Sequence, residues 1–149
     1  MTHNPIILIT GANGEVGHGL IEYFSSLAQA PEIVTLDLQP LDEALKPLVS
    51  QHYVGNILDD ALLKMLYDRH TIGRIFHLAA LLSTTGEKNP KLAHDVNVNG
   101  TQKLLDLAIR ASEEQGNAVK FIFPSSIAVY GLPDLATKED AGAIAEDDY

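Results

Sequence analysis

The stretch that decides the fold is "IILITGANGEVGHGL", which runs from Ile6 to Leu20. Its first five residues, Ile6–Thr10, predict a strand that is buried on both faces. Directly after the strand, glycine recurs at every third position, as Gly11, Gly14 and Gly17. Glycine permits a tight turn with positive φ and lets the backbone approach a ligand closely. The helix expected next would point its free N–H groups at that turn, which suits a pyrophosphate.

A carboxylate stands at the distance where a dinucleotide fold uses one. Asp37 ends the second predicted strand, Ile33–Asp37, and lies 20 residues after Gly17. It can accept hydrogen bonds from both hydroxyls of an adenosine ribose and would repel a 2′-phosphate. The closest downstream base is Lys46, so the pattern favours NAD over NADP. The simpler alternative is a glycine-rich turn without a ligand, in which Asp37 caps the turn.

Composition restricts the class of protein. The 149 residues are 46% hydrophobic and 20% charged, which is typical of one globular domain with a real core. The formal charge of −10 argues against a nucleic-acid or anionic-membrane partner. No cysteine is present and the six histidines show no metal-ligand spacing, so we expect no metal site. The longest apolar stretch, Ile75–Leu82, is too short to span a bilayer, and we expect a cytoplasmic protein.

Strand and helix patterns alternate along the rest of the chain. Further buried strands are predicted at Arg74–Ala80 and Lys120–Ser126, with a weaker one at His52–Asn56. Between them, helical spacing predicts amphipathic segments at Asp60–Arg69 and Lys91–Gln115. This alternation predicts an α/β, doubly wound Rossmann fold, a parallel sheet with helices on both sides.

The first of the predicted helices follows the glycine turn. It covers Val16–Leu27 and would place Val16, Leu20, Phe24 and Leu27 on one face. The corresponding apolar face of Asp60–Arg69 consists of Leu62, Leu63 and Leu66.

Five motifs in order carry a resemblance to a known family. They are "TGANGEVG", "LDL" with Asp37, "HLAA" at His77–Ala80, "NVNGT" at Asn97–Thr101 and "PSSIAVYG" at Pro124–Gly131. Together they resemble the extended short-chain dehydrogenase/reductases, the family of NAD-dependent epimerases and dehydratases, over nearly the whole sequence.

The resemblance implies NAD as cofactor and a contact set for it. The first turn would hold the pyrophosphate, and Asn56 would replace the usual aspartate beside the adenine. Leu78–Ala80 would pass under the cofactor, and Asn97 would help to order the site. The expected cofactor-binding residues are Gly11, Asn13, Gly14, Glu15, Val16, Gly17, Asp37, Asn56, Ile57, Leu78, Ala79, Ala80, Asn97 and Pro124.

The resemblance also implies a catalytic serine and a catalytic Tyr-x-x-x-Lys motif. Ser126 matches the serine, whose hydroxyl would bind the oxygen of the reacting carbon. The sequence contains no Tyr-x-x-x-Lys, and Tyr149 is either the tyrosine itself or lies shortly before it. We therefore expect residues 1–149 to be the N-terminal part of an NAD-binding Rossmann domain, truncated after its fifth strand, without the catalytic helix and the substrate lobe.

The substrate is left open between several classes. "HLAALLSTTGEKNP" at His77–Pro90 resembles the short-chain form of L-threonine 3-dehydrogenase, and Ser83, Thr84 and Ser126 are the expected substrate-binding residues. The leading hypothesis is an epimerase or dehydratase acting on a nucleotide sugar or a similar hydroxyl substrate. The alternatives are an L-threonine 3-dehydrogenase-like alcohol dehydrogenase and a non-catalytic nucleotide-binding sensor.

The resemblance further implies a homodimer for the full-length protein. The pairing helices of such a dimer would include Lys91–Gln115, and Leu107 and Ala111 would then face the partner. The alternative for these two residues is ordinary packing in the core of one protomer.

Overall fold

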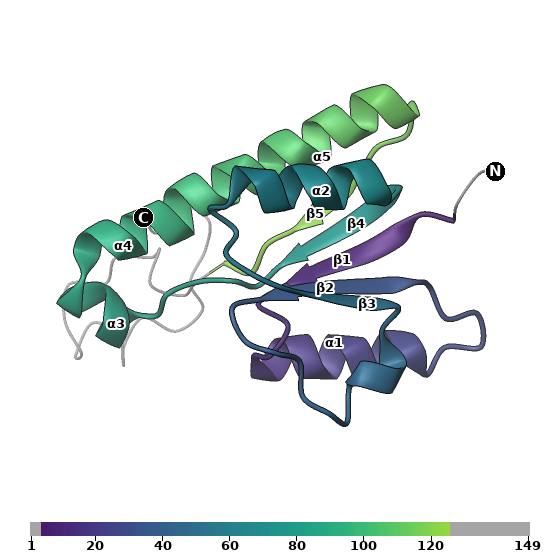
Figure 1. Cartoon of the computed structure of the whole chain (residues 1–149), viewed down its shortest axis with the longest axis horizontal. Helices are drawn as coiled ribbons and strands as arrows, with labels where there is room; N and C mark the ends of the chain where they lie inside the picture. Colours follow the sequence, from purple (N-terminus) through teal and green to yellow (C-terminus); the bar gives the residue numbers. More distant parts are fainter. Residues whose placement is uncertain (1–3, 126–149) are drawn as a thin grey trace, which may run out of the picture.

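The computed structural model describes residues 4–125, with the backbone only at 83–85, and shows alternating strands and helices (Figure 1). The strands and longer helices are β1 (Ile6–Thr10), α1 (Glu15–Ser25), β2 (Ile33–Asp37), β3 (Gln51–Val54), α2 (Asp60–Arg69), β4 (Ile72–His77), α5 (Thr101–Gln115) and β5 (Lys120–Ile122). Shorter helical segments are η1 (Lys46–Leu48), α3 (Ser83–Lys88), α4 (Pro90–His94) and the π-helical turn η2 (Asp95–Gly100).

The five strands form one parallel sheet in the order β3-β2-β1-β4-β5. The chain runs outward from β1 to β3, then crosses back to β4 on the other side of β1. Helix α1 covers one face of the sheet, and α2 and α5 cover the other (Figure 1). This arrangement confirms the predicted doubly wound α/β fold.

The core lies on both sides of the central strand, because successive residues of a strand point to opposite faces. Ile6 and Leu8 of β1 pack in the cluster that includes side chains of α2 and α5. Ile7 and Ile9 pack in the cluster that includes Ile21 of α1. These four side chains are at most 3% exposed, and full burial of each contributes about 2 kcal/mol.

The predicted apolar face of α1 is confirmed at Phe24 and at the partly buried Leu20, but it was wrong at Val16 and Leu27. Val16 is 61% exposed, whereas the buried residues of the helix are Gly17, Ile21 and Phe24. A Cβ atom on Gly17 would lie 2.4 Å from the carbonyl oxygen of Ala12. The glycine side of the helix is therefore pressed against the preceding turn, and this contact sets the rotation of the helix.

The two strands on the far side of β1 differ from their predicted form. β4 ends at His77 rather than Ala80, so 78–80 leave the sheet as irregular chain. β5 is short, and both Lys120 and Ile122 are exposed, although full burial was predicted. Within residues 4–125, β5 pairs only with β4, and an edge strand is less covered than a central one.

The segment predicted as one helix, Lys91–Gln115, is helical throughout but not regular. α4 and α5 are joined by the π-helical turn η2, and α5 ends at Gly116, which has a φ of 68°. Leu107 is 8% exposed and Ala111 is fully buried in the core of this protomer. The expectation that these two side chains face a partner was therefore wrong, because the inner face of α5 packs against its own sheet.

Candidate functional site

A cleft of about 350 Å³ opens at the carboxyl ends of the strands. Parallel α/β sheets bind ligands at the point where the chain reverses direction across the sheet, here between β1 and β4. Eight of the predicted cofactor-binding residues line this one cleft, and they are Gly11, Gly14, Asp37, Asn56, Ile57, Leu78, Ala79 and Ala80. The structure thus brings together residues that are up to 69 positions apart in the sequence.

Most of the remaining lining is apolar and was not predicted. It consists of Leu36, Leu38, Gly55, Leu81, Leu92 and Val96. Leu38 is 59% exposed in the structure. Because it directly follows Asp37, its place in the sequence could have identified it as a residue of the cleft. Leu92 and Val96 lie within the segment predicted as the amphipathic helix Lys91–Gln115, and sequence spacing does not distinguish a core face from a cleft wall. Apolar walls with a few polar groups are typical of sites for small molecules and cofactors.

Not every predicted residue reaches the cleft. Asn13, Glu15, Val16, Gly17, Asn97 and Pro124 are not among the residues that line it. Glu15 and Val16 are exposed on the first turn of α1, and Pro124 is exposed after β5. Gly17 packs against Ala12, as described above. Asn13 and Asn97 use their side chains to hold neighbouring backbone.

The glycine turn lies against the segment that follows β4. Gly11 has a φ of +69°, and a Cβ atom there would lie 2.6 Å from the backbone nitrogen of Ala79. Only glycine fits this position without strain, because the conformation and the contact both exclude a side chain. α1 begins directly after Gly14, and no side chain caps that helix end. The first N–H groups of the helix therefore face the turn without a side-chain acceptor.

Asp37 is held at the rim of the cleft by two backbone N–H groups. The N–H of Asn13 donates to Oδ2 and the N–H of Gln39 donates to Oδ1, each at 3.0 Å. A carboxylate oxygen can accept a second hydrogen bond. Both oxygens of Asp37 therefore keep acceptor capacity toward a ligand in the cleft.

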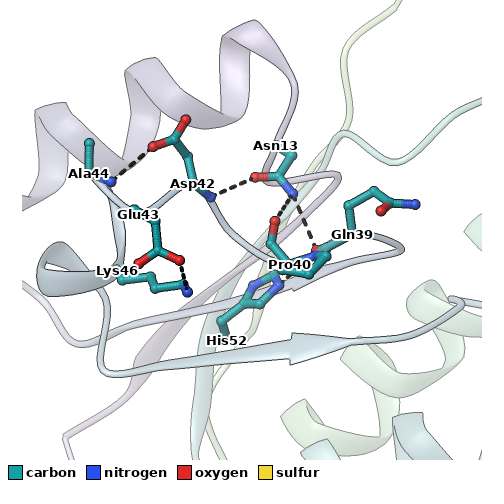
Figure 2. A network of polar contacts seen from close by, with 8 residues as sticks. All are labelled: Asn13, Gln39, Pro40, Asp42, Glu43, Ala44, Lys46 and His52. Carbon is teal, nitrogen blue, oxygen red and sulfur yellow. Dashed lines mark hydrogen bonds and ion pairs between the residues drawn. The ribbon is translucent and has the colours of Figure 1, made fainter.

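Asn13 ties the segment after Asp37 to the glycine turn. Its side-chain amide donates to the carbonyls of Gln39 and Pro40 and accepts from the N–H of Asp42 (Figure 2). The amide therefore faces the loop that follows β2, and its own contacts explain why it does not line the cleft.

Asn56 closes a local turn at the far side of the cleft. Its Oδ1 accepts the N–H of Leu58 at 3.0 Å. This bond fixes the orientation of the amide, because only the oxygen can face an N–H donor. Next to it, Ile57 is buried and packs into the core cluster beneath the cleft.

A buried histidine joins β1, β4 and α5. His77 Nδ1 lies 2.7 Å from Thr10 Oγ1, and its Nε2 lies 3.0 Å from Thr101 Oγ1. The Thr101 hydroxyl donates its only proton to the carbonyl of Asn97, at 2.7 Å. It must therefore accept from His77 Nε2–H, which leaves Nδ1 as the acceptor of the Thr10 proton. In the neutral imidazole, the chain of hydrogen bonds therefore runs in one direction, from the Thr10 hydroxyl to the Asn97 carbonyl.

Burial favours the neutral form of this imidazole. His77 is fully buried, and desolvation of the charged form lowers its pKa from 6.5 to about 4. The ring packs near Phe121 and Phe123, with centroid distances of 6.0 Å and 5.6 Å. The group is therefore a neutral structural link at neutral pH.

Asn97 lies in the π-helical turn and holds the backbone beside the cleft. Its Oδ1 accepts the N–H of Leu81 at 2.8 Å, and its Nδ2 donates to the carbonyl of Leu81 at 2.9 Å. Leu81 lines the cleft. Together with the contact of Thr101 to the Asn97 carbonyl, these bonds connect the His77 chain to the cleft wall.

The residues expected to act on a substrate are not placed by the structure. Ser126 and Tyr149 lie outside the described residues. Ser83 and Thr84 begin α3, of which the backbone alone is described at these positions. Since α3 follows the carboxyl end of β4 at His77, their backbone lies beyond the same edge of the sheet as the cleft (Figure 1).

The described residues contain neither a metal-binding cluster nor a membrane-spanning helix. Among residues 4–125, no three His, Asp or Glu side chains come close enough to share a metal ion. In the same range, the helices are all too short or too polar to cross a bilayer. Both findings concern only the residues that the structure describes.

Comparisons with known proteins give one consistent result. The sequence model described as the NAD dependent epimerase/dehydratase family matches residues 7–146. A human protein named inactive L-threonine 3-dehydrogenase, mitochondrial, is 30% identical over 131 residues, which are 87% of this chain and 54% of the human protein.

Solved structures show the same fold. A monomeric L-threonine 3-dehydrogenase from a metagenome is 32% identical, with a TM-score of 0.67 over 83% of this chain and 37% of that one. UDP-glucose 4-epimerase from Thermotoga maritima has a TM-score of 0.73 at 23% identity, over 87% of this chain and 40% of the enzyme. At that identity the likeness concerns the fold alone. The chain thus spans about two fifths of these structures and 54% of the human relative.

Proposed function

Because the chain belongs to the NAD-dependent epimerase/dehydratase family, we propose that residues 1–149 are the NAD-binding part of an enzyme that moves hydride between NAD and a hydroxyl-bearing substrate. The observation that carries the proposal is the cleft at the β1–β4 switch point. It has a glycine turn with an uncapped helix end on one side and the Asp37 carboxylate on the other.

The chain offers a contact for each part of the cofactor. Gly11, Gly14 and the first N–H groups of α1 would hold the pyrophosphate. The free acceptor positions of Asp37 would bind the ribose hydroxyls, which favours NAD over NADP. Ile57 and Leu38 offer apolar surface to the adenine, and Asn56 a polar group at its edge.

The reacting end of the cofactor would lie toward the segment after β4. Ala79 and Ala80 are small residues in the cleft wall, and small residues permit close approach of a ring. Asn97 would act there indirectly, by holding Leu81 in place. When bound, NAD supplies an acceptor and donor of hydride at its nicotinamide ring.

The catalytic groups proposed for the substrate come from the resemblance. Ser126 would hydrogen-bond the substrate oxygen as the hydroxyl becomes a carbonyl. A tyrosine, either Tyr149 or one beyond it, would take the hydroxyl proton with a lysine four positions later. A phenol has a pKa of about 10, so it needs such a neighbour to act as a base at neutral pH.

Three functions fit this site. The leading one is an epimerase or dehydratase on a nucleotide sugar or similar substrate, as the family description suggests. The first alternative, an L-threonine 3-dehydrogenase-like enzyme, is favoured by relatives and structures of that name near 30% identity. The second, a non-catalytic nucleotide-binding protein, is compatible with the human relative that is named inactive.

One set of assays separates these functions. NAD binding to the whole protein containing this chain is measured by calorimetry, with Asp37→Ala expected to weaken it about a hundredfold through loss of two hydrogen bonds to a charged group. NADH release is then followed with L-threonine and with UDP-glucose. Release with L-threonine indicates a dehydrogenase, and UDP-glucose conversion without net NADH indicates an epimerase. NAD binding without conversion of any substrate supports the sensor, and no NAD binding overturns the proposal.

Location and assembly are further proposals. The absence of cysteine from the 149 residues suits a reducing compartment, and we propose the cytoplasm. The human relative is named mitochondrial, so cell fractionation is the direct test. We also propose a homodimer for the full-length protein, as the family resemblance implies. The metagenomic L-threonine 3-dehydrogenase is described as monomeric. Light scattering of the full-length protein decides between a monomer and a dimer.

A further inference from the structure

The segment that follows Asp37 accepts hydrogen bonds from side chains on two sides. On one side stands Asn13 of the glycine turn, and on the other stands His52 of β3 (Figure 2). Between them run Gln39 and Pro40, whose carbonyls accept hydrogen bonds from both residues. This loop begins one residue after the carboxylate and carries the exposed wall residue Leu38.

Both the nitrogen and the oxygen of the Asn13 side-chain amide form hydrogen bonds with the loop. Nδ2 donates to the Gln39 carbonyl at 3.2 Å and to the Pro40 carbonyl at 2.8 Å. Oδ1 accepts the N–H of Asp42 at 3.3 Å. Three loop residues are thus held by one amide, which a shorter or purely accepting side chain cannot reproduce.

His52 holds the same carbonyl from the opposite direction. Its Nε2 donates to the Gln39 carbonyl at 3.0 Å, and its Nδ1 lies 2.8 Å from the hydroxyl of Thr35. Thr35 is fully buried in β2, so the imidazole is oriented by a fixed partner. The Gln39 peptide is therefore fixed by donors from two different elements.

The position of Gln39 decides the position of the Asp37 carboxylate. The N–H of Gln39 donates to Oδ1, while the backbone N–H of Asn13 donates to Oδ2. A displaced Gln39 would release one of the two bonds that orient the carboxylate. Asn13 therefore acts on Asp37 directly through its backbone and indirectly through its side chain.

We propose that Asn13 and His52 are positioning residues for ribose recognition: they fix Gln39, and Gln39 aligns Asp37 with the ribose hydroxyls. The proposal rests on the proposed function, because it presupposes that the cleft takes an adenine nucleotide. It gives the side chain of Asn13 a role in addition to the cofactor contact expected of this residue from the sequence.

The test compares ADP with 2′-deoxy-ADP, which lacks one of the two ribose hydroxyls that Asp37 would bind. In the whole protein, we expect wild type to bind ADP about tenfold more tightly than 2′-deoxy-ADP, as for one hydrogen bond to a charged group. In Asn13→Ala, we expect ADP binding to weaken about fivefold and 2′-deoxy-ADP binding to stay nearly unchanged. The preference for the ribose then falls to about twofold, whereas general destabilisation would weaken both nucleotides equally.

His52 supplies a rescue experiment. His52→Ala removes the second donor to Gln39 and is expected to reduce the preference about threefold. His52→Gln restores an N–H donor and is expected to recover part of the loss. Matched controls are His70→Ala and Asn117→Ala, which remove hydrogen bonds to Tyr53 and to the Gln115 carbonyl outside the cleft. Neither control is expected to change the preference.

The outcomes are distinct. A reduced preference for ADP over 2′-deoxy-ADP in Asn13→Ala and His52→Ala, with partial recovery in His52→Gln, supports the positioning role. If the variants keep the tenfold preference of wild type, the positioning role is overturned and the NAD-binding proposal stands. If wild type binds neither nucleotide, the proposed function fails and the inference falls with it.

Discussion

The two ends of the cleft are held in place by different kinds of polar network. At the Asp37 end, the bonds of Asn13 to the loop lie at the surface. At the β4 end, His77 is fully buried and links Thr10 to Thr101 inside the fold. Both networks place backbone beside the same cleft, one at Asp37 and one at Leu81.

This difference predicts that substitutions at the two ends have different effects. Surface hydrogen bonds exchange readily with water, so each contributes little to stability and acts mainly on position. A buried donor or acceptor that loses its partner costs the full desolvation penalty, about 1–3 kcal/mol. Changes at the Asp37 end should therefore alter ligand preference, and changes at the β4 end should alter folding stability.

The largest effect is expected at the turn that both ends share. Gly17→Ala places a Cβ atom 2.4 Å from the Ala12 carbonyl oxygen, and we expect about 3 kcal/mol of lost stability from this backbone clash. Gly19→Ala is the matched control in the same helix. Nothing lies within 4 Å of its Cβ position, and we expect a gain of about 0.5–1 kcal/mol from helix propensity. Urea unfolding of both variants tests this, and equal losses would contradict the packing role of Gly17.

The second effect is a pH dependence that belongs to the β4 end. Because burial lowers the pKa of His77 from 6.5 to about 4, the unfolded chain binds more protons than the folded one between these values. Stability should fall as pH falls, by about 2 kcal/mol between pH 7 and pH 5. Burial also lowers the pKa of His70, which adds to the loss in the same direction.

Two measurements check this dependence. Urea unfolding at pH 7, 6 and 5 gives the total change, and proton NMR of the imidazole resonances assigns it to a residue. The His77 resonance should not titrate above pH 5. A midpoint near pH 6.5 for His77 would contradict the buried neutral state.

A smaller effect is expected from breaking the chain of hydrogen bonds without removing the imidazole. Thr101→Val keeps the shape of the side chain but removes the acceptor for His77 Nε2–H and the donor to the Asn97 carbonyl. We expect a loss of about 1.5 kcal/mol, whereas Thr101→Ser keeps the hydroxyl and should lose about 0.5 kcal/mol. Thermal unfolding of the two variants measures the difference, and an equal loss would show that the methyl group matters more than the hydroxyl.

The smallest effect is expected beside the predicted adenine site. Asn56→Asp keeps an oxygen for the Leu58 N–H and adds a second acceptor for the adenine amine. We expect NAD to bind about threefold more tightly, a gain below 1 kcal/mol. Asn117→Asp adds the same charge away from the cleft and serves as the control. Unchanged or weaker NAD binding in Asn56→Asp would argue against an adenine at this position.

The fold was predictable because its signals are local and repeated. Continuous apolar runs at Ile6–Thr10 and Ile33–Asp37 are confirmed as β1 and β2 with unchanged bounds. Outer elements were less predictable. Lys120 and Ile122 of β5 are exposed although the strand was predicted to be buried, because burial depends on a strand's place in the sheet and, among the described residues, β5 is an edge strand.

The cleft was predictable only in part. Glycines and the carboxylate have special backbone or charge requirements that show in the sequence, so Gly11, Gly14 and Asp37 were found. Leu92 and Val96 were missed as lining residues because an apolar side chain has the same spacing in a core and in a cleft.

The sequence by itself determined the alternation of strands and helices, the turn that needs glycine and the place of the carboxylate, because these depend on periodicity and on residues with few substitutes. Only the tertiary structure decided what the polar side chains touch. Asn13 meets a loop 26 residues away, and His77 meets Thr10 across 67 residues. Such contacts depend on how β1, β2 and β4 lie side by side, and local patterns carry no information about that distance in space.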